Sequence, residues 1–520
     1  MATDDTGRVL LVRAVEPTSK RYDAIVIGSG MSGLSSAAIL AKEGKRVVVL
    51  EQHYRPGGYL HRFYRKGGLA FDVGFHYLGG IERHQVLGKY LQYLGVRDRV
   101  RLLPLDPEGY DDIHFPEQRF VIPAGEGRYR ERLLEAFPRE RPAIERYFRD
   151  LKHITEGFGF YQIRVSEELH HVDRWMSMPL QDYLAALTQD VRLRAVLTAQ
   201  NPLYGVEPRR TPVGLHALVT DSFMQNPYAI DGGGDALAQI MVARVRELGG
   251  EVRLKTRVSE ILVDDERAVR GVRTARGDEL LASTVVSCAH PKVTVGLLPE
   301  GVLRPGYRRR VLEMEDGPGT LSLFVTTRAD LSHYGGRNIY NYKTSDINAI
   351  YDNVEGKPQF VFVTVPTARE GIGKSGLHHV IGLALLGWKH VRAWEDTASG
   401  KRGEAYEAFK QQQAEELLGL VTEVVPELAG NIERIEAATP LTNRDFAGSV
   451  GGAAYGIHHS VEQSGRYGLR PRTRVGGLFL TGQSVLMPGV CGVTISAFHT
   501  CSQILGDEYL MRRVHEACDD

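Results

Sequence analysis

The stretch from Tyr22 to Glu51 constrains the fold of this chain more than any other segment. Four apolar residues, Ala24 to Ile27, form a predicted strand that runs into a glycine-rich turn and a helix of small residues. A second apolar strand, Val47 to Leu50, follows and ends on the acid Glu51. This order is typical of a βαβ unit in a parallel sheet, and a carboxylate at the end of the second strand is placed to bind a ribose.

The glycine-rich turn of this unit predicts a dinucleotide site. The first glycine permits a tight turn, the second lets the backbone approach a pyrophosphate, and the third lets the helix pack closely on the sheet. The free N–H groups at the start of the helix face the phosphates. The predicted binding residues here are Gly28, Gly30, Met31, Ser32 and Gly33.

Length and composition exclude several classes of protein. At 520 residues the chain is long enough for two or three domains. Lys plus Arg and Asp plus Glu both number 64, so no net field attracts nucleic acid. The four cysteines form no CxxC pair, which argues against a disulfide framework and fits a reducing compartment.

The sequence contains no targeting or membrane-spanning signal. Its start lacks the apolar core of a signal peptide, and no run of about 18 apolar residues occurs. We therefore expect a cytoplasmic location. Peripheral contact with a membrane remains open, because a hydropathy count does not reveal amphipathic surface patches.

The order of predicted elements indicates an α/β fold with a Rossmann-like FAD-binding domain and an inserted mixed α+β substrate domain. A second α/β signature starts at Asp231, and a final buried strand lies within Gly476 to Gln483. No second strand–GxGxxG–helix occurs, which favours a tightly held FAD over a diffusible nicotinamide. The predicted FAD-binding segments are 21–100, 226–300 and 437–520; the substrate-binding segments are 101–225 and 301–436; and 1–20 is a tail or an added edge strand.

Several motifs resemble those of a known family. A glycine pair follows the βαβ unit, and FDVG-x-HY (Phe71 to Tyr77) and a C-terminal strand–Thr-Gly–PG-x-x-G segment (Gly477 to Phe498) come later. This pattern resembles the FAD-dependent phytoene desaturase, carotenoid isomerase and all-trans-retinol 13,14-reductase (retinol saturase) family, within the amine oxidase-like flavoprotein superfamily. NPLYGVEP (Asn201 to Pro208) and Thr439 to Gly456 are also similar, so the resemblance spans nearly the whole chain.

The resemblance implies further FAD-binding residues. The glycine loop packs against the pyrophosphate, a backbone N–H and C=O face the adenine, and the C-terminal turn approaches the ribityl chain and flavin. The corresponding positions are Gln52, Gly57, Gly58, Tyr59, Val258, Gly482, Gln483, Pro488, Gly489 and Val490. Many flavin enzymes of this group carry an acid where Gln483 stands, so the electrostatics near the ribityl hydroxyl differ here.

The resemblance also implies an apolar polyene or isoprenoid substrate and an external electron donor or acceptor. A flavin supplies hydride exchange, which serves saturation or cis–trans isomerisation of a C=C bond. Desaturation by oxidised FAD is the alternative, and a non-catalytic flavoprotein that binds an apolar lipid is a further one. Of the three reactions, only saturation demands a stoichiometric proton donor.

The candidate catalytic residues are His76, Tyr77 and Tyr204. The resemblance brings the FDVG loop near the flavin, so His76 or Tyr77 is predicted either to donate a proton or only to hydrogen-bond the flavin or backbone. Tyr204 is predicted either to take part in the chemistry or to pack in the substrate wall. We expect Cys491 to be a small buried hydrophobe. No metal site is expected, because adjacent histidines on a strand point to opposite faces.

Overall fold

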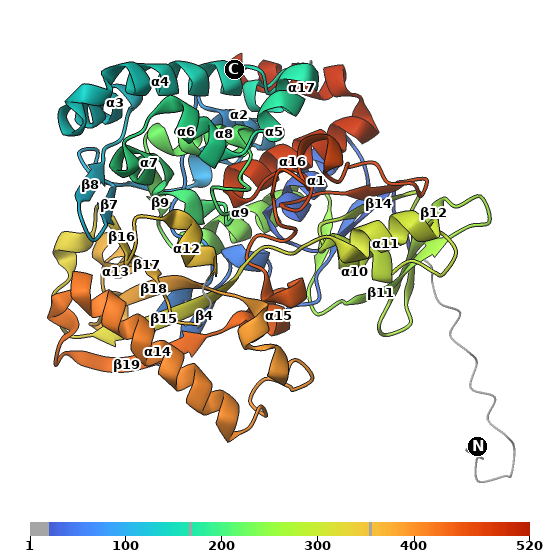
Figure 1. Cartoon of the computed structure of the whole chain (residues 1–520). Coiled ribbons are helices and arrows are strands. Elements are labelled where there is room, and N and C mark those ends of the chain that lie inside the picture. The colour runs from blue at the N-terminus through green and yellow to red at the C-terminus, as the bar shows by residue number, and fades with distance from the viewer. Residues whose placement is uncertain (1–19, 166–168, 353–355, 520) are drawn as a thin grey trace, which may run out of the picture.

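The computed structural model describes residues 20–165, 169–352 and 356–519 (Figure 1). The predicted tail, residues 1–20, lies outside this range except at its last residue. There the short strand β1 (Lys20–Arg21) pairs in parallel with β13 (Glu279–Leu281). Whether residues 1–19 form a tail or part of an added edge strand stays a prediction.

A five-stranded parallel sheet forms the centre of the nucleotide-binding region. Segments that lie far apart in the sequence meet in it, as expected for the α/β class. Its strands pair in one direction throughout. Their order is β10 (Glu251–Arg253), β3 (Val47–Leu50), β2 (Ala24–Ile27), β14 (Thr284–Ser287) and β20 (Leu478–Leu480).

Alternation along these strands produces two packed layers. Ala24 and Val26 of β2 join the core beneath the helices, whereas Ile25 and Ile27 join a separate core on the opposite face. Because both faces are covered, β2, β3 and β20 read as unbroken apolar runs. The second face packs against the sheet of β1, β13, β12 (Val269–Thr274) and β11 (Val258–Val263), with α10 (Pro291–Gly296) and α11 (Pro305–Glu313) nearby.

The helical layer is centred on α1 (Met31–Lys42), whose residues are all buried except the last. Its glycine, serine and alanine side chains allow close approach, and it packs between two other helices. These are α9 (Gly233–Glu247) and α16 (Gly489–Leu505). Further out lie α2 (Val86–Leu94) and α17 (Asp507–Asp519) (Figure 1).

A seven-stranded mixed sheet forms the other half of the molecule. Its order is β19 (Ile432–Ala438), β15 (Gly319–Thr327), β18 (His378–Leu386), β17 (Phe360–Thr364), β16 (Asn338–Tyr342), β7 (Asp111–His114) and β8 (Arg119–Ile122). One face packs on the long helix α14 (Glu404–Val424) through residues such as Leu323, Val361 and Val421. The opposite face is turned toward the centre of the molecule.

A group of helices covers that central side (Figure 1). They are α3 (Glu126–Ala136), α4 (Arg141–Glu156), α5 (Leu169–Met176), α6 (Leu180–Leu187), α7 (Val191–Thr198) and α8 (Val213–Met224). The 3₁₀ turn Pro138–Glu140 interrupts the helical pattern between α3 and α4, whereas Pro142 lies in the first turn of α4 and does not break it. The split into FAD-binding and substrate-binding segments stays a proposal.

Small elements connect the two halves. The hairpin of β4 (Arg62–Arg65) and β5 (Leu69–Asp72) leads into the loop that carries His76 and Tyr77. Phe71 of this hairpin packs against Phe324 and Ile381 of the seven-stranded sheet. The strand pair β6 (Leu102–Pro104) and β9 (Tyr228–Ile230) and the short helices α12 (Ile347–Asp352), α13 (Pro366–Glu370) and α15 (Pro440–Ala447) complete the described fold. Within the described ranges, no helix has the length and apolar character needed to cross a bilayer.

Candidate cofactor and substrate site

One large cavity, about 1070 Å³ in volume, lies between the two halves of the molecule. It opens at the carboxyl ends of β2 and β3 and at the N-termini of α1 and α16. Ligands of open parallel sheets bind in this position. The far part of the cavity continues over the seven-stranded sheet, so one space joins a nucleotide-type end to an apolar end.

Each of the three glycines in the first turn meets a different structural requirement. Gly28 adopts a φ of 95°, which only glycine takes without strain. A Cβ atom built at Gly33 would lie 2.1 Å from the carbonyl oxygen of Gly28, so Gly33 is required for α1 to pack. A Cβ at Gly30 meets only the sulfur of Cys288, at 3.5 Å. Gly30 therefore leaves room for a ligand, as predicted for a pyrophosphate.

The glycine pair lies directly against this turn. Gly57 donates its N–H to the carbonyl oxygen of Ser29 at 2.9 Å and forms an isolated bridge with Gly30. A Cβ at Gly58 would lie 3.4 Å from the Cα of Gly30. The two glycine segments thus form one backbone surface, without intervening side chains, at the start of α1.

The side chain of Glu51, at the end of β3, is held in place by hydrogen bonds from neighbouring residues. Its carboxylate accepts hydrogen bonds from the N–H and hydroxyl of Ser29, at 2.8 and 2.7 Å, and from the N–H of His53 at 2.8 Å. These bonds orient the carboxylate at the cavity wall. Gln52 is exposed beside it, and Val258, at the start of β11, lines the same end of the cavity.

The C-terminal segment closes the cavity from the opposite side. Gly482 has a φ of 105° and donates its N–H to Ser496 at 3.0 Å, while Ser32 of α1 and Thr481 share a hydrogen bond of 2.6 Å. The Gln483 amide donates to the carbonyl of Ala454 at 3.3 Å, so the amide that replaces the expected acid is held by its own chain. The remaining predicted residues of this turn, Pro488, Gly489 and Val490, all line the cavity.

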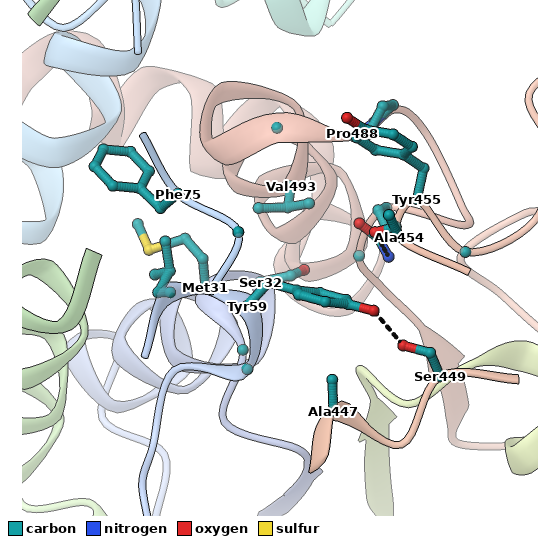
Figure 2. A pocket seen from close by; sticks show the side chains of 18 of the residues that line it. Met31, Ser32, Tyr59, Phe75, Ala447, Ser449, Ala454, Tyr455, Pro488 and Val493 are labelled. Atoms are coloured by element: carbon teal, nitrogen blue, oxygen red, sulfur yellow. Dashed lines mark hydrogen bonds between the residues drawn. The ribbon is translucent and has the colours of Figure 1, made fainter. Parts of the chain in front are cut away.

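Tyr59 joins the two sides of the cavity. Its hydroxyl is hydrogen-bonded to Ser449 (Figure 2) and donates to the carbonyl of Ala453 at 3.0 Å. Burial raises the pKa of Tyr59 to about 12, so the phenol stays neutral. The ring therefore acts as a cross-link between the glycine-pair loop and the loop around Ala454.

These features fit the FAD predicted from the sequence. Open space at Gly30, two helix N-termini and a carboxylate at the end of β3 match the needs of a pyrophosphate and a ribose. Met31, Ser32, Pro488 and Val493 surround the same space in Figure 2. Across the described ranges, no group of three or more His, Cys, Asp or Glu residues is arranged to hold a metal ion.

The far end of the cavity is an apolar wall built by strand alternation. Tyr340, Phe362 and Leu383 stand in register on β16, β17 and β18 and all line the cavity. Residues of α8 face them from the other side, among them Leu218 and Phe223. A long apolar molecule can lie across these strands, as expected for the substrate end.

The two neighbouring candidates for catalysis differ sharply in their surroundings. Both ring nitrogens of the cavity-lining His76 are buried without a hydrogen-bond partner in the described part of the chain, and burial lowers its pKa to about 4. Tyr77 donates its hydroxyl to Asp111 at 2.7 Å and lies 2.7 Å from the hydroxyl of Tyr340. Burial raises the pKa of Tyr77 well above 10. His76 is thus a neutral imidazole at pH 7, and Tyr77 is part of a buried network.

Tyr204 lies apart from this group. Its hydroxyl is 3.0 Å from Nδ1 of His216, and the residue is not among those that line the cavity. A catalytic role for Tyr204 stays a prediction, and the hydrogen bond to His216 does not support it. Burial raises the pKa of Cys491 to about 12, which agrees with an unreactive thiol.

Sequence reasoning missed two acids beside the cavity, one fully and one partly buried. Asp111 is fully buried, accepts hydrogen bonds from Gln200 and Asn338 at 2.7 and 3.0 Å, and has its pKa raised by burial to about 6. Asp221 accepts a hydrogen bond from the cavity-lining Tyr161. Neither acid lies in a recognisable sequence motif, and the residues that hydrogen-bond to them come from distant segments of the chain.

Fold and cavity together define a dinucleotide-binding flavoprotein. The family model described as "Flavin containing amine oxidoreductase" matches residues 31–366. The chain therefore belongs to the flavin-containing amine oxidoreductase family and is an FAD-dependent oxidoreductase, which confirms the predicted cofactor.

Individual proteins refine this placement. The chain is 29% identical to human all-trans-retinol 13,14-reductase, over 97% of this chain and 89% of that protein. It is 26% identical to the chloroplastic prolycopene isomerase of Arabidopsis thaliana, over 94% and 83%. An oxidoreductase structure from Methanosarcina mazei superposes with a TM-score of 0.65 at 14% identity, covering 92% of this chain and 99% of that one. That last match shows the fold alone.

Proposed function

We propose that this flavoprotein saturates or isomerises a carbon–carbon double bond in a long apolar polyene. We call the two glycine turns at the start of α1, Gly28 to Gly33 and Gly57–Gly58, the FAD cradle. The observation that carries the proposal is that one cavity joins this cradle to the apolar wall of Tyr340, Phe362 and Leu383. A polyene offers no charged group to grip, so its site needs extended apolar contact rather than ion pairs.

The related proteins support the same class of substrate. Proteins named all-trans-retinol 13,14-reductase and prolycopene isomerase align with nearly the whole chain. A zebrafish protein named an inactive all-trans-retinol 13,14-reductase is also 25% identical. Catalytic turnover must therefore be measured on this chain directly.

Residues at one end of the cavity bind the cofactor, and residues at the other end bind the substrate. Bound FAD supplies hydride exchange. The backbone of the glycine turns binds the pyrophosphate, and Glu51 orients the ribose. Phe362 and Leu383 exclude water and align the polyene. Tyr77, held by Asp111, fixes the edge of this wall next to His76.

Isomerisation is the second candidate because the prolycopene isomerases match the chain over almost its full length. Desaturation by oxidised FAD stays an alternative without a specific observation in its favour. We further propose an external electron donor and peripheral contact with a membrane, through which an apolar substrate could be reached.

Anaerobic reoxidation of the flavin tests the proposal. The purified protein should be yellow, and after chemical reduction it should be reoxidised by retinol or a carotenoid if it saturates them. Isomerised polyene without net flavin reoxidation would select the second candidate. An unchanged flavin and an unchanged polyene spectrum across a retinoid and carotenoid panel would refute both reactions and favour a lipid-binding role.

A further inference from the structure

A tyrosine–aspartate pair connects the cavity with a partly exposed residue of α8. Tyr161 belongs to a short 3₁₀ turn (Phe160–Gln162), lines the cavity and is 7% exposed. Its hydroxyl donates to Oδ2 of Asp221 at 2.5 Å. Asp221 is only partly buried and is not part of the cavity lining, so the pair spans from the cavity toward solvent.

The pair differs from the other tyrosine–aspartate contact that borders the cavity in the described structure. Asp111, the partner of Tyr77, is fully buried, and donors from Gln200 and Asn338 hold its carboxylate. Asp111 is 0% exposed, so its carboxylate does not meet the protein surface. Asp221 faces both Tyr161 and the protein surface and can be reprotonated from water.

We propose that Tyr161 donates the proton required for double-bond saturation and that Asp221 restores it from solvent. The inference rests on the proposed function, since isomerisation consumes no proton. Bound, reduced FAD would supply hydride, and with it both electrons, to one carbon of the double bond, and the Tyr161 hydroxyl protonates the other carbon. The carboxyl group of Asp221 then protonates the tyrosinate and takes a proton from water. An external electron donor would then reduce the oxidised FAD again.

The electrostatic surroundings suit this role. Burial raises the pKa of Asp221, and Glu126 of α3 acts in the same direction, while hydrogen bonds from Tyr161 and Gln225 oppose the shift. A protonated Asp221 can donate to the Tyr161 oxygen, which frees the phenolic O–H to point into the cavity. Burial and the nearby Asp221 raise the pKa of Tyr161 well above 10, and Cys491 contributes in the same sense.

The position of the pair along the cavity is also suitable. The 3₁₀ turn that carries Tyr161 contacts α16, and Cys491, in the first turn of α16, lines the cavity together with Tyr161. The same turn of α16 carries Gly489 and Val490, which we expect against the flavin. Tyr161 therefore borders the region in which the cofactor and the reacting double bond meet.

Product analysis with matched variants tests the proposal. We expect Tyr161→Phe to lower single-turnover saturation by about 100-fold and to lower the ratio of saturated to isomerised product. In the wild type, we expect the rate of saturation to fall as the pH rises through the pKa of Asp221. Asp221→Asn should remove this pH dependence. Tyr467→Phe and Asp265→Asn, at exposed positions away from the cavity, are the matched controls and should leave the product ratio near that of the wild type.

Two results would overturn the assignment. One is wild-type saturation by Tyr161→Phe, and the other is an equal loss of saturation and isomerisation, which a purely structural contact would cause. In deuterium oxide, the carbon that the Tyr161 hydroxyl protonates should carry a solvent-derived deuterium, whether or not the carbon that receives hydride is also labelled. A product without it also contradicts the proposed route.

A second measurement needs neither substrate nor turnover. With a fluorinated tyrosine at position 161, the fluorine NMR signal of the FAD-bound protein should titrate with Asp221 and lose that step in Asp221→Asn. A signal that ignores pH, or titrates equally in both proteins, refutes the coupling. If the wild type saturates no polyene, the proposed function fails, while this titration still decides whether Asp221 controls the Tyr161 proton.

Discussion

The FAD cradle and the apolar wall of the same cavity are built in opposite ways. The cradle depends on missing side chains: Gly30 leaves open space, and Gly33 allows α1 to reach the turn. The wall depends on side chains that three strands present on one face, such as Phe362 and Leu383. Changes in the cradle should therefore act on cofactor binding and local folding, and changes in the wall on the apolar ligand.

The largest effect is expected at Gly30, where Gly30→Val should abolish FAD retention. Gly30 has φ −61° and ψ 168°, which valine can adopt, and a Cβ meets only Cys288. The apoprotein should fold, but the side chain takes the space of the pyrophosphate. Flavin absorbance after gel filtration measures the loss. Gly127→Val, at an exposed site with no atom within 4 Å, is the control. Stoichiometric FAD in Gly30→Val would show that the cradle is misassigned.

Gly33 tests whether the cradle also carries a packing requirement. In Gly33→Ala the new Cβ clashes with the Gly28 carbonyl at 2.1 Å, and both partners are backbone-constrained. Overpacking of this kind costs about 1–3 kcal/mol. We expect that loss in the free energy of unfolding of the apoprotein, measured by urea denaturation. Gly127→Ala should be nearly neutral, and an equally stable Gly33→Ala protein would contradict the close approach of α1.

The same contrast explains how much of the molecule could be predicted. β2 and β3 begin and end at the predicted residues, because each is a short apolar run between turn signals. The cradle residues lie within these local motifs, so they could be proposed from the sequence. The wall could not. β7 pairs with β16, more than 200 residues later, and no sequence pattern encodes that partner. For the same reason Asp111 and the Tyr161–Asp221 pair emerged only from the structure.

The wall is tested by a polar substitution that leaves the cradle intact. Leu383→Gln places an amide on the apolar face, where burial without a partner costs about 1–3 kcal/mol. We expect FAD content to stay normal and the affinity for a retinoid or carotenoid to fall roughly tenfold, since 1.4 kcal/mol corresponds to that factor. Fluorescence or absorbance titration of the oxidised protein measures the affinity. Leu383→Met keeps the surface apolar and should bind like the wild type. Equal binding by Leu383→Gln would move the polyene away from this wall.

The smallest effect is expected at Tyr59, the residue that joins the two sides of the cradle. Tyr59→Phe keeps the ring but removes the hydroxyl that contacts Ser449 and the carbonyl of Ala453. A hydrogen bond of this kind contributes about 1 kcal/mol. Because the bond holds the cavity wall rather than the ligand itself, FAD should still bind but dissociate about fivefold faster. Stopped-flow release of FAD to an acceptor apoprotein measures the rate, and Tyr467→Phe, on an exposed tyrosine, should leave it unchanged. An unaltered rate in Tyr59→Phe would mean that the two loops are held together without this cross-link.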